Sequence, residues 1–365
     1  MIKNICHITT VHPRNDIRIF HKQCKSLSKN YNVKLIVADG KGNATVDNIM
    51  IIDLGLRQQS RIKRARIDSK KALTKALELN CDVYHFHDPE LIKIGVQLKK
   101  AGKKVIYDTH EDLPRQILSK PYINKYIKPL LSRFIEWQEN KAAKQFDYIC
   151  SATPFIRDRF QKINKNTVDI NNYPIIGELQ SSNVKKENCF CYTGGITEER
   201  GIINIVKAID KLDTKIILAG SVDSENYLKK METLPEWKKI DFLGLVERKE
   251  VAEIMSKSIA GIVTFLPMPN HINAQPNKIF EYMSSGIPVI GSNFNLWKEI
   301  IEENNCGICV DPTKPSEISK ALLKLKNNPN IVTEMGKNGQ KAVLEKYNWK
   351  VEEGKLFRVY QSLDS

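Results

Sequence analysis

Short runs of β-branched and apolar residues alternate along the chain with longer segments whose apolar residues recur at helical spacing. The runs that predict strands lie at 4–9, 33–38, 48–53, 83–87, 104–108 and 147–151 in the first half, and at 189–193, 215–219, 240–243, 260–265, 288–291 and 307–310 in the second. Helices are predicted between several of them, including 16–29, 61–80 and 90–101. This alternation is typical of parallel sheets covered by helices on both faces.

The alternation occurs twice, which predicts an α/β protein of two doubly wound, Rossmann-like domains. We place the first domain at residues 1–172 and the second at 187–347, with the boundary in the polar, turn-rich stretch 171–186. A last helix is expected over 348–365. The length of 365 residues suits two domains of ordinary size.

Composition narrows the class of protein. A hydrophobic content of 41% excludes a disordered polyelectrolyte. No stretch reaches the roughly 18 consecutive apolar residues of a transmembrane helix, and the first residues lack the apolar core and cleavage site of a signal peptide. We therefore expect a cytoplasmic protein, with peripheral attachment to the inner face of the membrane as a further expectation from its charge.

The formal net charge of +15 belongs entirely to the first half of the chain. Residues 1–175 hold 32 Lys and Arg against 17 Asp and Glu, whereas residues 176–365 hold 25 of each. This asymmetry predicts an anionic partner for the first domain. Nucleic acid is not expected, because no recognition motif accompanies the charge.

Two segments concentrate the basic residues. Residues 57–75 carry eight basic side chains and one acid. In residues 120–144, basic and aromatic side chains are interleaved: Lys120, Tyr122, Lys125, Tyr126, Lys128, Arg133, Phe134 and Trp137. A basic amphipathic segment with aromatics is typical of binding to an anionic membrane surface. The alternative is a solvated helical face whose aromatics pack into the core.

The eight cysteines include two close pairs, Cys189 with Cys191 and Cys306 with Cys309. Together the pairs could form a four-thiolate zinc site. Both lie in apolar, strand-like runs, however, where cysteine acts as a small core residue, and we favour that interpretation.

Polar residues gather where the predicted strands end, and ligands of parallel α/β sheets bind outside the carboxyl ends of the strands. In the first domain these candidates are His12, Arg14, Asp16, His85, His87, Asp88, His110 and Glu111. In the second, the loops that follow strands bring Gly194, Gly195, Arg200, Gly220 and Asn277.

The glycines at 194 and 195 lie between a predicted strand and a helix, where backbone N–H groups can approach a phosphate. Arg200 could bind the phosphate oxygens through its planar guanidinium. An ordinary strand–helix turn with a solvated arginine is the alternative, because the stretch has neither a Walker lysine nor a Gly-x-Gly-x-x-Gly pattern.

Three histidines of the first domain, His85, His87 and His110, could form a metal site, with Asp88 and Asp112 nearby. His85 and His87 are two apart on a strand and share one face. A histidine at a strand end serves equally as a neutral hydrogen-bonding group for a sugar or a carbonyl.

Glu281 lies about one turn inside a predicted helix that is otherwise apolar. A buried carboxylate without partners would cost several kcal/mol, roughly the penalty of an unmade charged hydrogen bond. The two hydroxyls of a ribose, each donating to one oxygen, would satisfy it.

The segment 276–291, PNKIFEYMSSGIPVIG, closely resembles the donor-binding region of family 4 glycosyltransferases with the GT-B fold. The resemblance extends over nearly the whole chain and implies two Rossmann-like domains facing a central cleft, with helix 348–365 packing back on the first. It implies an acceptor-binding first domain and a donor-binding second domain. A retaining transfer from a UDP- or GDP-sugar is expected, without a metal or other cofactor.

The resemblance also implies roles for the candidate residues. Arg200 and Lys278 would bind the diphosphate beside the Gly194–Gly195 loop, and Glu281 the ribose. Gly220, Leu243 and Asn277 are expected at the donor as well. His110 would hold the donor sugar and act with the two cations in catalysis. The residues at the strand ends of the first domain, His12, Arg14, Asp16, His87, Asp88 and Glu111, are expected on the acceptor side.

Two positions depart from the family pattern. Asn273 stands where the family has the first acid of a Glu-x₇-Glu pair, and HPRNDIR at 12–18 replaces the usual N-terminal Gly-Gly loop. The latter resembles a subgroup associated with bacterial surface polysaccharides, which implies a lipid-linked glycan acceptor. A nucleotide-sugar epimerase of GT-B shape and a metal-dependent hydrolase using His85, His87 and His110 are the alternative enzymes.

Overall fold

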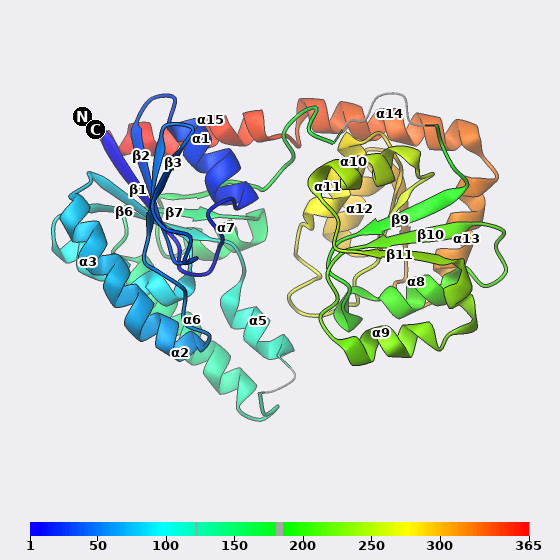
Figure 1. Cartoon of the computed structure of the whole chain (residues 1–365), viewed down its shortest axis with the longest axis horizontal. Coiled ribbons are helices and arrows are strands. Elements are labelled where there is room, and N and C mark those ends of the chain that lie inside the picture. The colour runs from blue at the N-terminus through cyan, green and yellow to red at the C-terminus, as the bar shows by residue number, and fades with distance from the viewer. Residues whose placement is uncertain (121–122, 180–184, 365) are drawn as a thin grey trace. The chain divides into compact units, whose positions relative to one another are not determined.

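The computed structural model describes residues 1–120, 123–179 and 185–364 of the chain. It separates into two compact units, one of residues 1–172 with 350–365, the other of residues 173–349 (Figure 1). Part of the expected linker, residues 180–184, lies outside the described residues, as does Tyr122.

An eight-stranded sheet forms the centre of the first unit, in the order β3-β4-β2-β1-β5-β6-β7-β8. Its strands are β1 (Asn4–Ile8), β2 (Asn32–Val37), β3 (Ala44–Val46), β4 (Ile49–Asp53), β5 (Val83–Phe86), β6 (Lys104–Thr109), β7 (Tyr148–Ser151) and β8 (Thr167–Asp169). Only β3 pairs antiparallel among the described strands of this sheet. The six strands expected from the sequence are confirmed, and the short β3 and β8 were not predicted.

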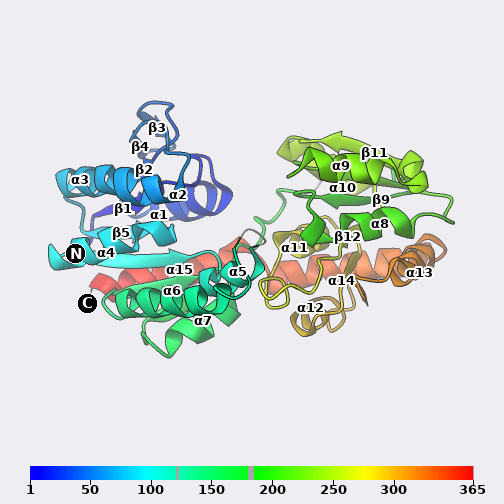
Figure 2. The ribbon, with the colours of Figure 1, turned by 90° about the horizontal axis from the view of Figure 1, so that it is seen from below.

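Helices cover both faces of this sheet (Figure 2). They are η1 (Ile17–Cys24), α1 (Lys25–Leu27), α2 (Arg61–Lys63), η2 (Arg64–Asp68), α3 (Ser69–Leu79), η3 (Pro89–Leu91), α4 (Ile92–Lys100), α5 (Leu113–Ser119), α6 (Lys128–Ala143), α7 (Pro154–Gln161) and α15 (Trp349–Asp364). One face packs its apolar side chains against α3, α4, α6 and α7. The π-helical η1 and α15 contact the opposite face, through Arg18 and Tyr360.

The second unit contains a six-stranded parallel sheet in the order β11-β10-β9-β12-β13-β14. Its strands are β9 (Cys189–Thr193), β10 (Lys215–Ala219), β11 (Ile240–Gly244), β12 (Gly261–Val263), β13 (Val289–Ser292) and β14 (Gly307–Val310). All six were expected. Cys189 and Cys191 lie on β9, whereas Cys309 lies on β14 and Cys306 directly before it. Strands β12 and β13 lie between the two pairs, so the pairs are too far apart to share one zinc ion.

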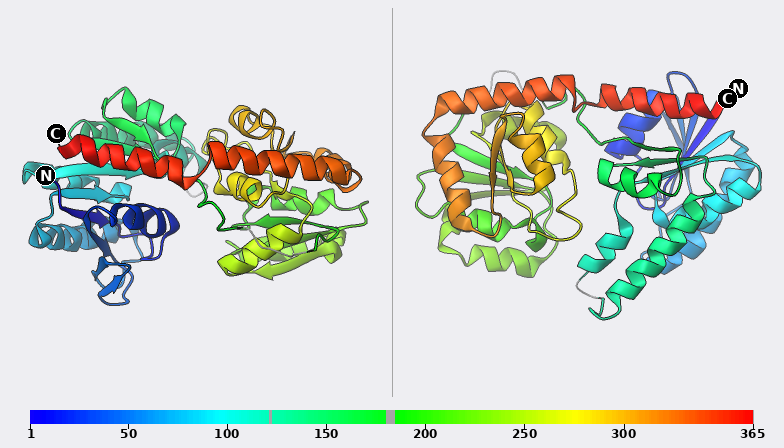
Figure 3. Two further views of the ribbon diagram at one scale, coloured as in Figure 1. Left: turned by 90° about the horizontal axis from the view of Figure 1, so that it is seen from above. Right: turned by 180° about the vertical axis from the view of Figure 1, so that it is seen from behind.

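The helices of the second unit form two layers around its sheet (Figure 3). They are η4 (Glu198–Arg200), α8 (Ile202–Ala208), α9 (Glu225–Glu232), η5 (Pro235–Lys239), α10 (Arg248–Lys257), α11 (Asn277–Ser284), α12 (Asn295–Ile301), α13 (Pro315–Lys326) and α14 (Pro329–Glu345). One layer packs α10, α11, α12 and α14 on the sheet, and the other α8, α9 and α13. No described helix combines the length and apolarity needed to cross a bilayer.

The structure has two parallel α/β sheets, as the sequence predicts. Because parallel strands end at the same edge of a sheet, the loops that follow β9, β10 and β12 start from one edge of the second unit. In the first unit, the same applies to the residues that follow β1, β5 and β6.

Candidate functional site

The glycine loop after β9 meets the loop after β10 at the edge of the second sheet. The N–H of Gly194 donates to the carbonyl oxygen of Ala219 at 2.8 Å. A Cβ added to Gly220 would lie 1.8 Å from the carbonyl oxygen of Gly194. Only glycine therefore fits at position 220, and the structure brings two of the predicted site residues into direct backbone contact.

Two cationic side chains flank this loop. Arg200 ends the short 3₁₀ helix η4, and its Nη1 donates to the carbonyl oxygen of Gly195 at 3.3 Å. A Cβ at Gly194 would lie 3.3 Å from Nη1 of Arg200 and 3.6 Å from Cε of Lys278. The predicted residues Gly194, Gly195, Arg200 and Lys278 thus form one cluster, suited to an anion of more than one negative charge.

Gly201, the residue after Arg200, has a left-handed backbone with φ of +69°. A Cβ there would lie 2.4 Å from the carbonyl oxygen of Thr264, so no larger residue fits. The Arg200 guanidinium lies over the ring of Phe265 at 5.2 Å from its centroid. A close backbone approach and a cation–π contact therefore hold the arginine beside the glycine loop.

The carboxylate of Glu281 on α11 is buried and has two protein partners. Nζ of Lys278 lies 2.6 Å from Oε2, and Nη1 of Arg248 lies 2.8 Å from Oε1. Burial alone would raise the pKa of Glu281, but Lys278 and Arg248 outweigh it and lower the pKa to about 2. Glu281 is therefore ionised, and Arg248 is a member of the site that the sequence interpretation missed.

Of three other positions singled out in the second unit, two lie near the ends of elements and one lies in a turn. Leu243 is exposed in the last part of β11, and Asn277 is exposed as the first residue of α11. Asn273, which replaces the family's acid, is half-buried in the turns before α11. The roles of these three residues stay predictions.

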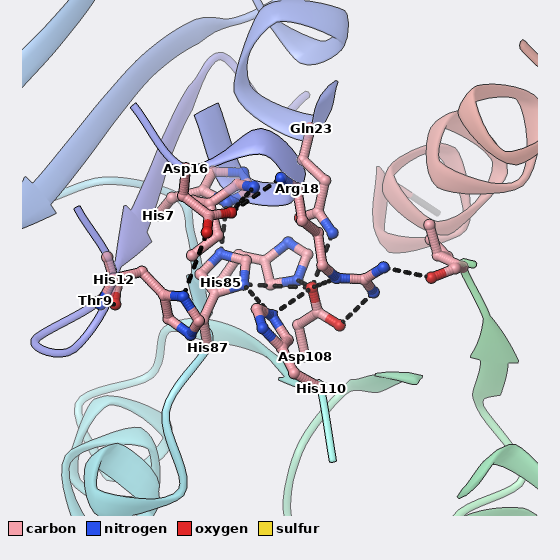
Figure 4. A network of polar contacts seen from close by, with 12 residues as sticks. His7, Thr9, His12, Asp16, Arg18, Gln23, His85, His87, Asp108 and His110 are labelled. Carbon is pink, nitrogen blue, oxygen red and sulfur yellow. Dashed lines mark hydrogen bonds and ion pairs between the residues drawn. The ribbon is translucent and has the colours of Figure 1, made fainter. Parts of the chain in front are cut away.

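In the first unit, five histidines gather near Asp108, on β1, β5 and in the loops that follow β1, β5 and β6: His7, His12, His85, His87 and His110 (Figure 4). The centre is Asp108, which is fully buried on β6. Its Oδ1 accepts from Nη2 of Arg18 at 2.7 Å, and its Oδ2 from Nε of Arg18 at 3.1 Å and Nε2 of Gln23 at 2.7 Å. Nδ1 of His87 lies 3.2 Å and Nε2 of His110 3.4 Å from the same Oδ2.

Burial and charge set opposite protonation states within this group. Burial raises the pKa of Asp108, but Arg18 and His110 outweigh it and hold the pKa well below its usual range. Burial lowers the pKa of His87 to about 3 and, with His87 beside it, holds the pKa of His85 well below its usual range. The aspartate is therefore ionised while the buried histidines are neutral near pH 7.

His12 joins this group from the loop after β1. Its Nδ1 lies 3.3 Å from Oδ2 of Asp16, its Nε2 lies 3.7 Å from Oδ1 of Asp88, and its ring centroid lies 4.9 Å from that of His110. Burial lowers the pKa of His12, but Asp16 and Asp88 outweigh it and raise the pKa. Asp16 also caps η1 by accepting from the N–H groups of Arg18 and Ile19.

Two predicted acceptor-side residues have other partners. Arg14 forms a two-point ion pair with Asp39, with Nε and Nη2 at 2.8 and 2.7 Å from the carboxylate oxygens. Glu111 accepts from the amide of Gln116. The structure thus brings together His12, Asp16, Asp88, His87 and His110, while Arg14 and Glu111 are engaged by their own neighbours.

His85, His87 and Asp108 place ligand atoms within 4.8 Å of one another, close enough for one metal ion. They nevertheless do not fit a metal site. The guanidinium of Arg18 already contacts both oxygens of Asp108, so a cation there would be repelled and would have to displace it. The metal hypothesis based on His85, His87 and His110 is not supported.

The sequence interpretation missed Asp108, Arg18 and His7 as members of this group. His7 lies opposite His85 in the β1–β5 register, and its Nδ1 is 2.9 Å from Nε2 of His87. An arginine within the apolar segment IRIF at 17–20 signals a buried charge that needs a partner, and it could have pointed to an aspartate. The distance of 90 positions between them hides which aspartate it is.

Residues 178–342 match the family model of the glycosyl transferases group 1. The D-rhamnosyltransferase WbpZ of Pseudomonas aeruginosa is 22% identical over 299 residues, which cover 76% of each chain. The capsular polysaccharide biosynthesis glycosyltransferase CapM of Staphylococcus aureus is 21% identical over 168 residues, 43% of this chain and 41% of the relative.

Solved structures resemble the chain over nearly its whole length. Sucrose-phosphate synthase (tll1590) from Thermosynechococcus elongatus matches with a TM-score of 0.82 at 15% identity, covering 99% of both chains. Anabaena Alr3699/HepE in complex with UDP-glucose matches with a TM-score of 0.73 at 14% identity, covering 98% of this chain and 99% of that one. At sequence identities this low, the structural similarity shows a shared fold and nothing more.

Proposed function

Because the chain belongs to the group 1 glycosyl transferases, family 4, with the GT-B fold, we propose that it transfers a sugar from a nucleoside-diphosphate donor to a lipid-linked glycan of the cell surface, with retention of the anomeric configuration. The observation that carries the proposal is the cluster of Arg200 and Lys278 around the Gly194–Gly195 loop. A glycosyltransferase that cleaves a sugar–diphosphate bond has to stabilise the negative charge of the departing diphosphate, and this cluster can supply the positive charge for it.

The second unit is the donor domain in this proposal. Arg200, Lys278 and the backbone N–H groups of the loop stabilise the diphosphate as negative charge develops on its leaving oxygen. Carboxylate oxygens accept about four hydrogen bonds in all, so Glu281 retains capacity for two ribose hydroxyls beside Lys278 and Arg248. Leu243, Asn277 and Gly220 are proposed to contact the remainder of the nucleotide.

The first unit is the acceptor domain in this proposal, and His110 holds the donor sugar. The acceptor hydroxyl attacks the anomeric carbon from the face that the diphosphate leaves, the carbon–oxygen bond to the diphosphate breaks, and the hydroxyl proton passes to the departing phosphate oxygen. His12, with Asp16 and Asp88 beside it, supplies polar groups for the acceptor.

The surface of α6 supports docking on an anionic membrane. Leu130, Phe134 and Trp137 share one face of this helix by their spacing of four and three, and they are 69%, 51% and 57% exposed. Nζ of Lys141 lies over the Trp137 ring at 5.4 Å. The alternative in which these aromatics pack into the core is wrong. We define this set, Leu130, Phe134, Trp137 and Lys141, as the α6 face.

The test is a thermal-shift screen of nucleotides and nucleotide sugars, followed by product analysis with lipid-linked glycan acceptors. A bound donor raises the unfolding temperature according to its affinity and concentration. Arg200→Ala is expected to lose most of the nucleotide-induced shift and of the turnover, whereas Lys207→Ala on α8 changes neither. Full turnover by Arg200→Ala would contradict the assignment of this cluster as the donor site. Turnover of the donor in the absence of an acceptor would favour an epimerase.

A further inference from the structure

A continuous chain of hydrogen-bonding groups runs through the interior of the first unit, from His110 to the C-terminal helix. Nε2 of His110 lies 3.2 Å from Nδ1 of His87, and Nε2 of His87 lies 2.9 Å from Nδ1 of His7. Nε2 of His7 is 3.4 Å from the hydroxyl of Tyr360 on α15, which is 2.8 Å from Nδ1 of His85. All except His110 are fully or almost fully buried.

At the His110 end of this hydrogen-bonded chain, Asp108 determines which ring nitrogens of His87 and His110 carry protons. Its carboxylate is ionised, so it only accepts hydrogen bonds, and Arg18 and Gln23 already donate to it. Among the described residues, the next nitrogens around Oδ2 are Nδ1 of His87 at 3.2 Å and Nε2 of His110 at 3.4 Å, with Nε2 of His85 farther away at 3.9 Å. A ring nitrogen without a proton would direct its lone pair at the carboxylate, which is unfavourable in a buried site.

Nδ1 of His87 either carries a proton or does not. In both cases, the proton of neutral His110 is placed on Nε2. If Nδ1 of His87 carries the proton, it donates to Asp108, and Nε2 of His110 avoids repulsion from the carboxylate by carrying its own proton. If Nδ1 of His87 is bare, it needs a donor, which at 3.2 Å is again the Nε2–H of His110. In its neutral form His110 therefore has the proton on Nε2 and a lone pair on Nδ1.

Nδ1 of His110 makes no hydrogen bond with any residue that the structure describes, and the side chain is 16% exposed. The nitrogen is therefore available to a ligand. We propose that Asp108 is the positioning residue of this site, accepting the Nε2–H of His110 so that its Nδ1 accepts a hydrogen bond from a sugar hydroxyl. This step rests on the proposed function, because it takes the ligand of His110 to be the donor sugar.

The experiment reads the proton position directly. The protein is labelled with ¹⁵N at its seven histidines, and long-range ¹⁵N–¹H spectra give the tautomer of each ring, with His110→Gln identifying the signal of His110. We expect the Nε2–H form in the wild type and its loss in Asp108→Asn. The matched control, Tyr107→Phe, removes a buried hydroxyl of the same strand that bonds Glu139 on the other face, and it should leave the signal unchanged.

Kinetics then connect the tautomer to turnover. A misoriented group costs about 100-fold in rate, so Asp108→Asn should lower kcat by about that factor while the KM for the donor changes far less. Tyr107→Phe should keep the wild-type kcat. Asp108→Asn leaves Arg18 without its partner and could unfold; the wild-type spectrum decides the proton position in that case.

The outcomes of these two experiments distinguish a failure of the positioning role of Asp108 from a failure of the proposed sugar contact of His110. A wild-type His110 protonated on Nδ1, or a tautomer unaffected in folded Asp108→Asn, overturns the positioning role. The expected tautomer, lost in Asp108→Asn without any loss of kcat, supports the positioning role and removes His110 from the proposed contact with the sugar.

Discussion

Nη1 of Arg248 donates to Oε1 of Glu281 at 2.8 Å, across 33 positions of sequence. With Lys278 on the other oxygen, this contact satisfies a carboxylate that burial would otherwise penalise. Glu281 therefore does not depend on a ligand to be stable in the fold. A nucleotide would find it already ionised and oriented, which is the condition for a preorganised acceptor of ribose hydroxyls.

We predict that Glu281→Gln lowers nucleotide affinity by about tenfold or more, because a hydrogen bond to a charged group contributes about 1.5–3 kcal/mol. Titration calorimetry with the nucleotide that stabilises the wild type measures this. The control is Glu178→Gln, which removes the other carboxylate bonded to Arg248, at 2.9 Å, without changing Glu281. Equal losses in both variants would mean that Arg248, and not Glu281, governs affinity.

We predict that Gly220→Ala destabilises the second unit by about 1–3 kcal/mol, the usual cost of overpacking, and weakens nucleotide binding. The new Cβ would lie 1.8 Å from the carbonyl oxygen of Gly194, so the glycine loop has to move. Urea unfolding measures the change. Gly354→Ala on α15, whose Cβ would meet only Nη1 of Arg358 at 3.7 Å, should instead add stability of up to about 1 kcal/mol. Unaltered nucleotide affinity in Gly220→Ala would exclude the loop from the donor site.

We predict that replacing Phe134 and Trp137 by serine abolishes binding to vesicles that contain anionic lipid, because their insertion and the basic charge act together. Both side chains are more than half exposed, so the unfolding temperature should not fall. Leu344→Ser on α14 removes an apolar side chain that is 56% exposed in the second unit, and serves as the control. Vesicle co-sedimentation at low and high salt measures the effect, and retention of binding by the double variant would contradict a role for the α6 face.

We predict that the protein loses stability in acid, beginning near pH 6.5. Burial holds the pKa of His7 and His85 well below 6.5 and lowers that of His87 to about 3. The unfolded chain therefore binds more protons than the folded one between pH 6.5 and about 3, so stability is full above pH 6.5 and falls as the pH drops. Each histidine contributes a slope of up to about 1.4 kcal/mol per pH unit.

Urea unfolding at a series of pH values measures this slope. His87→Gln should reduce the slope between pH 5.5 and 4 by up to about 1.4 kcal/mol per pH unit, the contribution of one proton. His12→Gln is the control: the pKa of His12 is raised, so it is protonated in both states below pH 5.5 and its removal leaves that slope unchanged. A slope that stays the same in His87→Gln would show that His87 is not buried in its neutral form.

Much of the fold follows from local pattern. The expected strands at 189–193, 215–219 and 307–310 coincide with β9, β10 and β14, because a buried parallel strand is a short apolar run between turn-forming residues. The three-residue strands β3 and β8 escaped prediction, because β3 (Ala44–Val46) buries little and β8 (Thr167–Asp169) has a single apolar residue. In the cluster of the second unit, residue type and place after a strand nominated Gly194 and Arg200, and the family resemblance nominated Lys278.

By itself, the sequence determined two parallel α/β domains, a basic first half and the phosphate-binding residue types at the strand ends, because each of these depends on neighbours within a few positions. Only the tertiary structure decided which charges meet. The registers of β1, β5 and β6 place His7, His85 and Asp108 on one buried face, and Arg18 and Arg248 reach carboxylates 90 and 33 positions away. Protonation states depend on such contacts and on burial, and both arise only when the sheets and helices pack.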